Sequence, residues 1–272
     1  MSGQYLVAVD LEGIRGVVGT PYEGLCFGSQ EYERAVKNAV DEVNAVVKGL
    51  FDGGAKLVAV WDNHGGGNNL DFSKIDSRVV KISPISMKKY ERLSFVKEYS
   101  FDGILYVGYH SKEGSLNGVL AHSYSSKAIQ YFKVNGNAVG ELEIDSWAAA
   151  EYGIAPLFCA SDDVGVKQAL SINENMQTVI TKYGTGRNSA TFRNEKEVLS
   201  EMYEKAFNCV NSIAVSKKMQ FPAELELRYT RSEDALKNME KALAYGQNVT
   251  YGEDSHIIKT TLRSFADIET FL

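Results

Sequence analysis

The sequence predicts an α/β fold: a mainly parallel sheet flanked by helices, with a smaller C-terminal α/β domain. The runs YLVAVDL (residues 5–11) and KLVAVWD (56–62) are almost continuously apolar, which is typical of strands buried on both faces. Between them, residues 30–50 repeat apolar side chains every three or four positions, as one face of a helix does. A strand, a helix and a second strand in this order favour a parallel pair joined by a crossover connection.

The helix expected over residues 30–50 has signals at both ends. Ser29 precedes it and is a residue type that commonly caps helix N-termini, while Gly53 and Gly54 follow it and stop it. The apolar spacing predicts one buried stripe. Its members are Tyr32, Val36, Ala39, Val43, Val46 and Leu50.

Beyond residues 71–100, which are less regular, apolar runs and turn formers alternate again. The Asn135-Gly136 pair predicts a tight hairpin turn, because both residue types tolerate the backbone conformation that such a turn needs. The elements expected in this part are a strand FDGILYVGYH (101–110), a hairpin YFKVNGNAVG (131–140), a helix from Glu141 to Gly153 and a strand PLFCASDD (156–163).

The stretch TKYGTGRNSATFRN (181–194) is rich in turn formers and predicts a boundary between two domains. The larger domain would comprise residues 1–192 and the smaller α/β domain residues 193–272. The elements expected in the smaller domain are a helix over residues 195–214, a strand ELELRYT (224–230), a helix from Ser232 to Gly246, and a short terminal strand and helix.

Composition excludes several classes of protein. The 272 residues are 44% hydrophobic and 24% charged, as in an ordinary globular protein. The net charge of −6, without a block of Lys or Arg, argues against a nucleic-acid partner. No apolar run reaches the roughly 18 residues of a membrane span, and the N-terminal segment lacks the basic start of a signal peptide. The 3 cysteines form no CxxC pair, which favours a reducing compartment, by default the cytoplasm.

Acidic and imidazole side chains lie at the ends of the predicted strands. Asp10 and Glu12 close the first strand, and His64 and His110 follow two later ones. Because open α/β sheets bind ligands outside the carboxyl ends of their strands, one fold could bring these side chains together. Asp10 and Glu12 are two residues apart, so in an extended chain both carboxylates face the same side and need a cation between them. With Glu141 they form a set of oxygen and nitrogen ligands typical of zinc.

Five candidate ligands exceed what one catalytic zinc needs, whereas two metal ions that share a carboxylate would use them all. The chain is therefore interpreted as a metal-dependent hydrolase with its catalytic site in residues 1–192. A single acid or histidine in a loop is more often structural than a ligand, so the interpretation depends on the joint pattern. Three of the 4 histidines, His122 in GVLAHS included, follow short apolar runs. His256 is expected at the surface, and GTGRNS (184–189) as a plain turn.

With these segments laid out, the chain resembles the zinc D-aminopeptidases of the DppA type, a family of metallopeptidases. The resemblance runs over roughly residues 5–190. The segments that carry it, in order, are VDLEGIRG, DNHGGGNNL, VGYH, GVLAHS, VGELEI, the SDD after PLFCA, and TKYGTGR.

The resemblance implies a site and an activity. His122, in the GVxxHS motif, matches the catalytic residue proposed for the family. The family also implies a centre of two zinc ions per subunit, release of an N-terminal D-amino acid from short peptides, and a ring-shaped homo-oligomer, a decamer. The positions that match the metal ligands of the family are Asp10, Glu12, His64, His110 and Glu141.

The chain departs from the family pattern at a few places. The loop SKEGSLNGVLA before His122 is one residue longer, Trp61 and Asn63 flank Asp62 where other residues are familiar, and the part after about residue 195 matches weakly. These departures leave the matched metal ligands intact. They bear on the choice of substrate and on the oligomer.

The expected chemistry is metal-assisted hydrolysis of an amide bond. Zinc would lower the pKa of a shared water towards roughly 7, and His122 would serve as proton shuttle or as nucleophile. Lys182 and Arg187 could bind a substrate carboxylate or could be surface residues of a turn, and Asp62 could orient a ligand histidine. Two alternatives stay open: a dinuclear-metal amidase or esterase for other small acyl substrates, and an α/β module that binds a metal or metabolite without catalysis.

Overall fold

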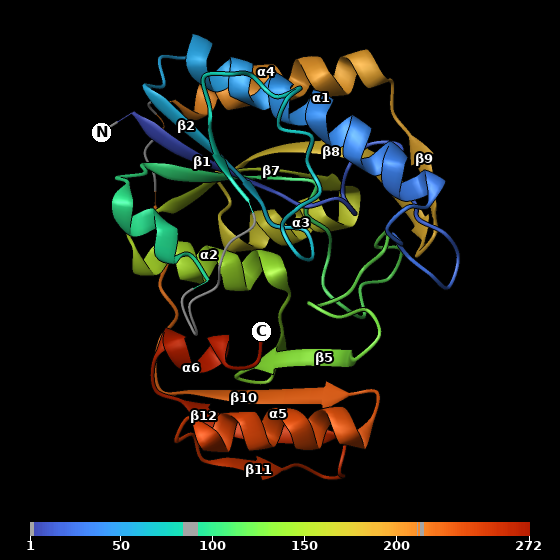
Figure 1. Ribbon diagram of the computed structural model, residues 1–272, viewed down its shortest axis with the longest axis vertical. Helices are drawn as coiled ribbons and strands as arrows, with labels where there is room; N and C mark the ends of the chain where they lie inside the picture. Colours follow the sequence, from blue (N-terminus) through green and yellow to red (C-terminus); the bar gives the residue numbers. More distant parts are fainter. Residues whose placement is uncertain (1–2, 84–91, 211, 213–214) are drawn as a thin grey trace.

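The computed structural model describes residues 3–83, 92–210, 212 and 215–272 (Figure 1). Its main element is a sheet in the strand order β3-β2-β1-β4-β7-β8-β9, with parallel neighbours except for the β8–β9 pair. The strands of this first sheet are β1 (Gln4–Val9), β2 (Leu57–Asp62), β3 (Val80–Ile82), β4 (Gly103–Val107), β7 (Ala155–Asp162), β8 (Gln177–Gly186) and β9 (Ser189–Phe192).

Strand β1 lies inside the first sheet, between β2 and β4, and both of its faces are covered. Tyr5, Val7 and Val9 belong to the hydrophobic core on one side, and Leu6 and Ala8 belong to the core on the other side. Alternate side chains of a strand point to opposite faces, so only a strand covered on both faces is apolar throughout. The continuous apolar run in the sequence is explained by this position.

Helices cover both faces of the first sheet (Figure 1). One pair of helices packs together on one face, and a second pair lies on the other face. The first pair is α1 (Gln30–Asp52) and α4 (Glu195–Cys209), and the second is α2 (Glu141–Glu151) and α3 (Asp163–Ile172). The predicted cap of α1 is confirmed, because the Ser29 hydroxyl accepts a hydrogen bond from the main-chain nitrogen of Tyr32 at 3.1 Å.

A second sheet, which is antiparallel, lies beyond α2 (Figure 1). Its strand order is β11-β12-β10-β5-β6, and helix α5 (Ser232–Ala244) packs against three of its strands. Asn135 and Gly136 connect β5 to β6 with φ values of 50° and 77°, which confirms the predicted hairpin turn. The strands are β5 (Ile129–Val134), β6 (Asn137–Ala138), β10 (Ala223–Tyr229), β11 (Val249–Tyr251) and β12 (Ile257–Leu262).

The predicted α/β class, a mainly parallel sheet flanked by helices, is confirmed. The turn-rich stretch 181–194, however, forms the β8–β9 hairpin at the edge of the first sheet. The division at residue 192 stays a prediction. The second sheet takes β5 and β6 from before this residue, and α4, which follows it, packs against α1.

Smaller details complete the comparison with the expected elements. The helix expected over 195–214 ends at Cys209, and its positions 211 and 213–214 lie outside the described residues. Short elements close the list: η1 (Ser94–Glu98), a 3-10 helix, and α6 (Phe265–Glu269). In the described part of the chain, no helix has the length and apolar character needed to cross a membrane.

Candidate metal centre

The topology of the first sheet brings three chain segments to one edge. Strands β2, β1 and β4 are neighbours and run parallel, so their carboxyl ends lie together. Asp10 follows β1 directly, and His64 and His110 come shortly after β2 and β4. The sequence placed these residues at strand ends. The adjacency of the three strands is what makes their side chains converge.

Asp10 occupies the centre of the cluster, with one oxygen facing each side. Its Oδ1 lies 2.9 Å from Nδ1 of His64, and its Oδ2 lies 3.5 Å from Nε2 of His110. Glu12 joins the first side, since its Oε2 is 3.2 Å from Nδ1 of His64. A single carboxylate therefore lies between two groups of possible ligands.

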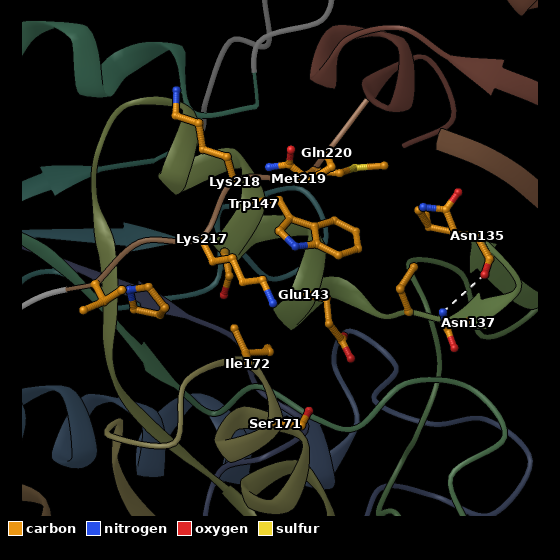
Figure 2. A pocket seen from close by; sticks show the side chains of 15 residues that line it. Asn135, Asn137, Glu143, Trp147, Ser171, Ile172, Lys217, Lys218, Met219 and Gln220 are labelled. Atoms are coloured by element: carbon orange, nitrogen blue, oxygen red, sulfur yellow. Dashed lines mark hydrogen bonds between the residues drawn. The ribbon is translucent and has the colours of Figure 1, made fainter. Parts of the chain in front are cut away.

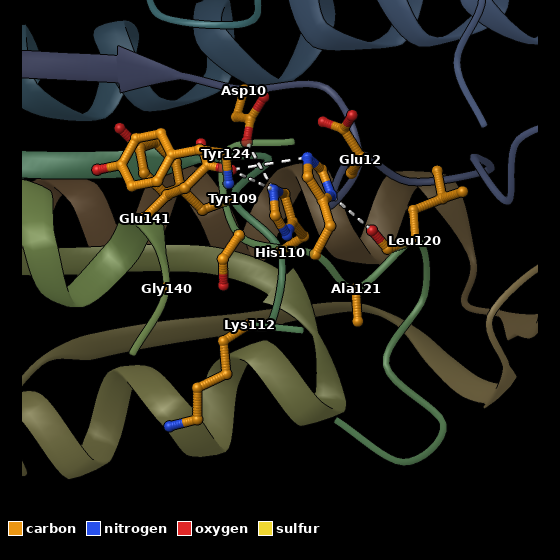
Figure 3. Close-up of polar contacts among 12 residues, drawn as sticks. Asp10, Glu12, Tyr109, His110, Lys112, Leu120, Ala121, Tyr124, Gly140 and Glu141 are labelled. Carbon is orange, nitrogen blue, oxygen red and sulfur yellow. Dashed lines mark hydrogen bonds and ion pairs between the residues drawn. The ribbon is translucent and has the colours of Figure 1, made fainter. Parts of the chain in front are cut away.

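The second side of the cluster contains His110 and Glu141, which Figure 3 shows, together with His122. Oε1 of Glu141 lies 3.4 Å from Nε2 of His110 and 3.6 Å from Nε2 of His122. The two imidazole rings stack, with their centroids 4.0 Å apart and their planes at 10°. Glu141 is the first residue of α2, and its Oε1 also accepts a hydrogen bond from the main-chain nitrogen of Tyr124 at 2.8 Å.

Hydrogen bonds to main-chain oxygens determine which histidine nitrogens remain available. Nδ1 of His110 is 3.0 Å from the oxygen of Ser111, and Nδ1 of His122 is 2.8 Å from the oxygen of Leu120. A carbonyl can only accept, so each Nδ1 carries the proton and donates it. When neutral, each ring therefore has an unprotonated Nε2 on the side of Glu141, which is the form that binds a metal or accepts a proton.

The donor set fits a divalent cation. Two groups each have ligand atoms within 4.8 Å of one another: Asp10, Glu12 and His64, and His110, His122 and Glu141. Oε2 of Glu12 and Nε2 of His110 are buried and have no hydrogen-bond partner in the structure. Buried polar atoms without partners are rare in proteins, and a cation between the two groups would satisfy both.

The buried carboxylates of the cluster also favour a positive charge beside them. Burial, together with the charge of Glu12, raises the pKa of Asp10 to about 7. Burial acts against the charged form of Glu141 as well, but His110 outweighs it and lowers the pKa of Glu141 to about 2. Burial likewise disfavours protonated His64, yet Glu12 and Asp10 outweigh it and raise its pKa to about 12. In the absence of a metal, protonated histidines supply this charge.

The loop after β1 is fixed from two sides. The main-chain nitrogen of Gly13 donates to the oxygen of Gly108 at 2.7 Å, and a Cβ on Gly13 would lie 2.0 Å from the oxygen of Tyr109. Lys182, in β8, donates from Nζ to the main-chain oxygens of Glu12 at 2.6 Å and Ile14 at 2.8 Å. Lys182 is fully buried, so both readings of it, as a substrate-binding residue and as a surface residue, are wrong.

Asp62 does not orient a ligand histidine as expected. Its Oδ2 accepts from the main-chain nitrogen of Leu70 at 2.8 Å, and its Oδ1 accepts from the side chain of Asn69 at 2.8 Å. The Asn69 side chain also donates to the main-chain oxygen of His64 at 2.6 Å. Asp62 therefore shapes the loop that carries His64, and does so through the main chain and Asn69.

A buried polar network under the cluster was missed by the sequence analysis. The carboxylate of Asp145 pairs with Arg92 and accepts from the hydroxyl of Tyr109 at 2.7 Å and the side chain of Asn63 at 3.0 Å. Asn63 and Tyr109 are the residues directly before His64 and His110. The position of Asp145, one helical turn after Glu141 on α2, was the available signal, because residues four apart share a helix face.

A cavity of about 440 Å³ opens onto the cluster. The cavity is lined by Asp10, Glu12, His64, His122 and Glu141, whereas His110 is buried and is not among its lining residues. Charged, polar and apolar side chains also line the cavity. They include Glu23, Phe27, Tyr124, Lys127 and Arg187.

A second cavity of about 350 Å³ lies on another part of α2 (Figure 2). Trp147, Ile172 and Lys217 are among the residues that line it. The candidate metal ligands are not among its lining residues, so it is separate from the cluster. His256, expected at the surface, contacts the main-chain oxygen of Tyr229 in the second sheet through Nδ1 at 3.3 Å and takes no part in either cavity.

An α/β sheet with buried carboxylates and imidazoles at the carboxyl ends of its parallel strands defines a candidate metallohydrolase. The chain belongs to the D-aminopeptidase family: the family model Peptidase_M55, described as D-aminopeptidase, matches residues 4–254. It is similar to the D-aminopeptidase of Bacillus subtilis (strain 168), with 30% identity over 183 residues, 67% of this chain and 65% of that relative. The predicted resemblance is thus confirmed.

The fold also has a counterpart among solved structures. It is the Zn-dependent D-aminopeptidase DppA from Bacillus subtilis, described as a self-compartmentalizing protease. The match has a TM-score of 0.84 and a sequence identity of 22%, and it covers 98% of this chain and 94% of that one. This likeness confirms the architecture of both sheets.

Proposed function

We propose that the protein is a metallo-aminopeptidase with a centre of two zinc ions, which removes the N-terminal residue, a D-amino acid, from short peptides. The observation that carries the proposal is the central position of Asp10, whose two oxygens face His64 on one side and His110 on the other. Glu12 and Glu141 complete the two sides. A carboxylate between two ligand groups is the arrangement that a pair of metal ions requires.

Each residue has a role in this proposal. Asp10, Glu12 and His64 would hold one ion, and Asp10, His110 and Glu141 the other. Zinc, when bound, acts as a Lewis acid and lowers the pKa of a bound water to about 7. The network of Asp145 with Asn63 and Tyr109 would keep the two histidine-bearing segments in place, since it bonds the residue before each histidine.

His122 is the proposed catalytic residue. Its Nδ1 is occupied by the oxygen of Leu120, so Nε2 is the atom that can accept or deliver a proton in the cavity. Burial and the nearby charge of His110 lower the pKa of His122, which keeps the ring neutral and able to act as a base. We propose the proton-shuttle role on this basis, and a nucleophilic role is the alternative that trapping of a covalent intermediate would reveal.

The acidic character of the cavity supports the recognition of an amine. Glu23 lies at its mouth, and Asp10, Glu12 and Glu141 lie in its wall. An N-terminal α-amine is positively charged near neutral pH and is favoured in such surroundings. The preference for a D-amino acid is proposed from the family, whose description is D-aminopeptidase.

We also propose that the protein acts as a homo-oligomer, a decamer, in the cytoplasm. The related DppA is described as self-compartmentalizing, and the apolar side chains of Tyr22, Phe27 and Leu116 are largely exposed on this chain. Cys26, Cys159 and Cys209 are free thiols, as expected in a reducing compartment.

Metal analysis combined with a hydrolysis assay tests the proposal. The purified protein should contain about two zinc ions per chain and should release D-alanine from D-alanyl-D-alanine, with activity lost on chelation and restored by zinc. A panel of D- and L-aminoacyl amides and small esters addresses the alternative. Metal-dependent cleavage of esters or acyl amides without a free α-amine, in the absence of peptide cleavage, would favour an amidase or esterase.

A further inference from the structure

Three polar residues at the junction of β7 and α3 bind loops near the metal centre, although none of them is a proposed ligand. They are Ser161, Asp162 and Asp163, the SDD of the sequence. The Ser161 hydroxyl donates to the main-chain oxygen of Tyr109 at 2.6 Å, and Oδ1 of Asp163 accepts from the nitrogen of Gly184 at 2.9 Å. This junction therefore connects segments that are far apart in the sequence.

Asp162 is buried and uses both of its carboxylate oxygens. Oδ1 accepts from the main-chain nitrogen of Gly165 at 2.7 Å and caps α3. Oδ2 accepts from the main-chain nitrogen of Val119 at 2.6 Å. A helix cap needs only one oxygen, so the second one serves another purpose. It holds the loop that carries His122, three residues after Val119.

This loop has an unfavourable backbone conformation directly after Val119. Leu120 has a φ of 52°, in the left-handed region that a leucine rarely adopts, because its Cβ crowds the neighbouring carbonyl. Such a conformation persists where the surroundings hold it, and it occurs most often at functional sites. Leu120 is held from both sides of the turn: Asp162 binds the residue before it, and its own nitrogen donates to the main-chain oxygen of Arg187 at 2.8 Å.

The conformation of Leu120 determines how the His122 ring is oriented. The main-chain oxygen of Leu120 accepts a hydrogen bond from Nδ1 of His122 at 2.8 Å. With the proton on Nδ1, Nε2 is free and lies 3.6 Å from Oε1 of Glu141. If Leu120 relaxed to an ordinary conformation, its carbonyl would turn away from Nδ1, and either ring nitrogen could then carry the proton.

We infer that Asp162 is a positioning residue for the proposed reaction. Its bond to Val119 holds the left-handed turn at Leu120, and this turn keeps the proton of the neutral His122 ring on Nδ1. The inference rests on the proposed function, which assigns proton transfer to Nε2 of His122. A catalytic histidine in the wrong tautomer is a poor base, so a residue that selects the tautomer affects the rate without contact with the substrate.

Asp162→Ser separates the two bonds of the carboxylate, because a serine can cap α3 but is too short to bind Val119 as well. In the zinc-loaded protein, kcat for D-alanyl-D-alanine should fall by about 10-fold, less than the 10²–10⁴ expected for complete loss of general acid–base catalysis. KM and zinc content should stay at the wild-type values. Asp162→Asn, which keeps the volume and one acceptor for the cap, should behave alike and serves if the serine variant is unstable.

A double-mutant cycle shows whether Asp162 acts through His122. In the His122→Ala background, Asp162→Ser should cause no further decrease of the residual kcat, because the ring that Asp162 positions is gone. A residue that only stabilised the fold around the cavity would lower the activity by the same factor in both backgrounds.

The tautomer of His122 can be observed directly by ¹⁵N NMR of the zinc-loaded protein labelled in its histidines. The signals of His122 are those that are missing in His122→Ala. In the wild type, one nitrogen of this ring should have the shift of a protonated nitrogen and the other the shift of an unprotonated one. In Asp162→Ser the two shifts should move towards each other as the tautomers exchange.

Asn194→Ala is the matched control for the loss of a helix cap. The Asn194 side chain caps α4 by accepting from the main-chain nitrogen of Lys196 at 3.0 Å, and Asn194 does not line the cavity of the metal centre. The control should lower the unfolding midpoint, while kcat and the His122 signals should equal those of the wild type.

Three results would overturn the inference and leave the proposed function intact. They are an unchanged kcat in Asp162→Ser, an equal decrease of kcat in the His122→Ala background, and His122 shifts in Asp162→Ser that match the wild type. A zinc-loaded wild type that hydrolyses no dipeptide would instead contradict the proposed function. The NMR comparison would then still decide whether Asp162 holds the His122 ring.

Discussion

The ammonium nitrogen of Lys182 lies 2.6 Å from the main-chain oxygen of Glu12, in the interior of the protein. A second bond of 2.8 Å joins it to the oxygen of Ile14. Burial lowers the pKa of Lys182 to about 8, which shows that the surroundings oppose its charge. The two hydrogen bonds offset part of this cost, and they fix the segment that carries the proposed ligands Asp10 and Glu12.

Replacement of Lys182 by methionine should therefore weaken both the fold and the zinc site. Two buried carbonyl groups would lose a charged donor, at a cost of about 2–4 kcal/mol in the free energy of unfolding. Urea denaturation in the presence of a chelator measures this loss, and a zinc titration measures the weaker binding. Lys127→Met, at an exposed position, is the matched control. Unchanged stability and zinc affinity in the Lys182 variant would show that the two hydrogen bonds from Lys182 are unimportant.

His122→Ala should lose activity and keep its metal. General acid–base catalysis contributes about 10²–10⁴ in rate, so kcat should fall by a factor in this range. Zinc per chain should remain at the wild-type value, because Asp10, Glu12, His64, His110 and Glu141 are the proposed ligands. His256→Ala, in the second sheet, is the control and should retain full activity. A His122 variant with near-wild-type turnover, or with one zinc fewer, contradicts the assigned role.

Glu42 should make stability depend on pH. Burial raises its pKa from 4.5 to about 7, and its Oε2 has no hydrogen-bond partner. The folded state then binds more protons than the unfolded state between pH 4.5 and 7, so the free energy of unfolding should decrease as the pH rises through this range. The full shift corresponds to roughly 3 kcal/mol.

Glu42→Gln removes the titrating group and tests this dependence. The variant should be more stable than the wild type at pH 8, by about 1–3 kcal/mol, and close to it at pH 4.5. Glu33→Gln, on the exposed side of the same helix, is the control and should show the wild-type pH profile. The prediction is wrong if the free energy of unfolding of Glu42→Gln, like that of Glu33→Gln, differs from the wild-type value by the same amount at pH 4.5 and at pH 8.

Asp145→Ala should be strongly destabilising. It leaves Arg92 with an unpaired buried charge, which costs about 3–5 kcal/mol, and removes the acceptor shared by Asn63 and Tyr109. The affinity for zinc should fall together with the stability, because Asn63 and Tyr109 precede the two histidines His64 and His110. The double change Asp145→Leu with Arg92→Met should recover part of the stability, because an apolar pair avoids the unpaired charge. Equal losses in the single and double variants would argue against a charge effect.

The central elements of the fold were predictable because their patterns are local. The apolar run of β1 and the apolar stripe of α1 follow directly from burial on both faces of a strand and on one face of a helix. The β8–β9 hairpin was missed, since an exposed edge contains turn formers and few apolar residues. The pairing of β5 with β10 joins segments almost a hundred residues apart, and no local pattern records such a partner.

The site shows the same division. Acids and histidines at strand ends were visible in the sequence, and the order β2-β1-β4 brings them together. The buried roles of Lys182 and Asp145 were not visible, because lysine and aspartate in a sequence resemble surface residues until their partners are known. For the same reason, Asp62 was predicted to orient a ligand histidine, whereas its carboxylate in fact accepts a hydrogen bond from the side chain of Asn69.

Quantification of zinc in the wild type and in Asp10→Ala tests the central claim most directly. Asp10 faces both ligand groups, so its loss should impair both sites, whereas Glu23→Gln at the cavity mouth should have no effect on the metal. We predict about two zinc ions per wild-type chain and markedly fewer in Asp10→Ala, with hydrolysis lost in parallel. A wild-type protein that binds no zinc, or an Asp10 variant that binds as much as the wild type, would contradict the account.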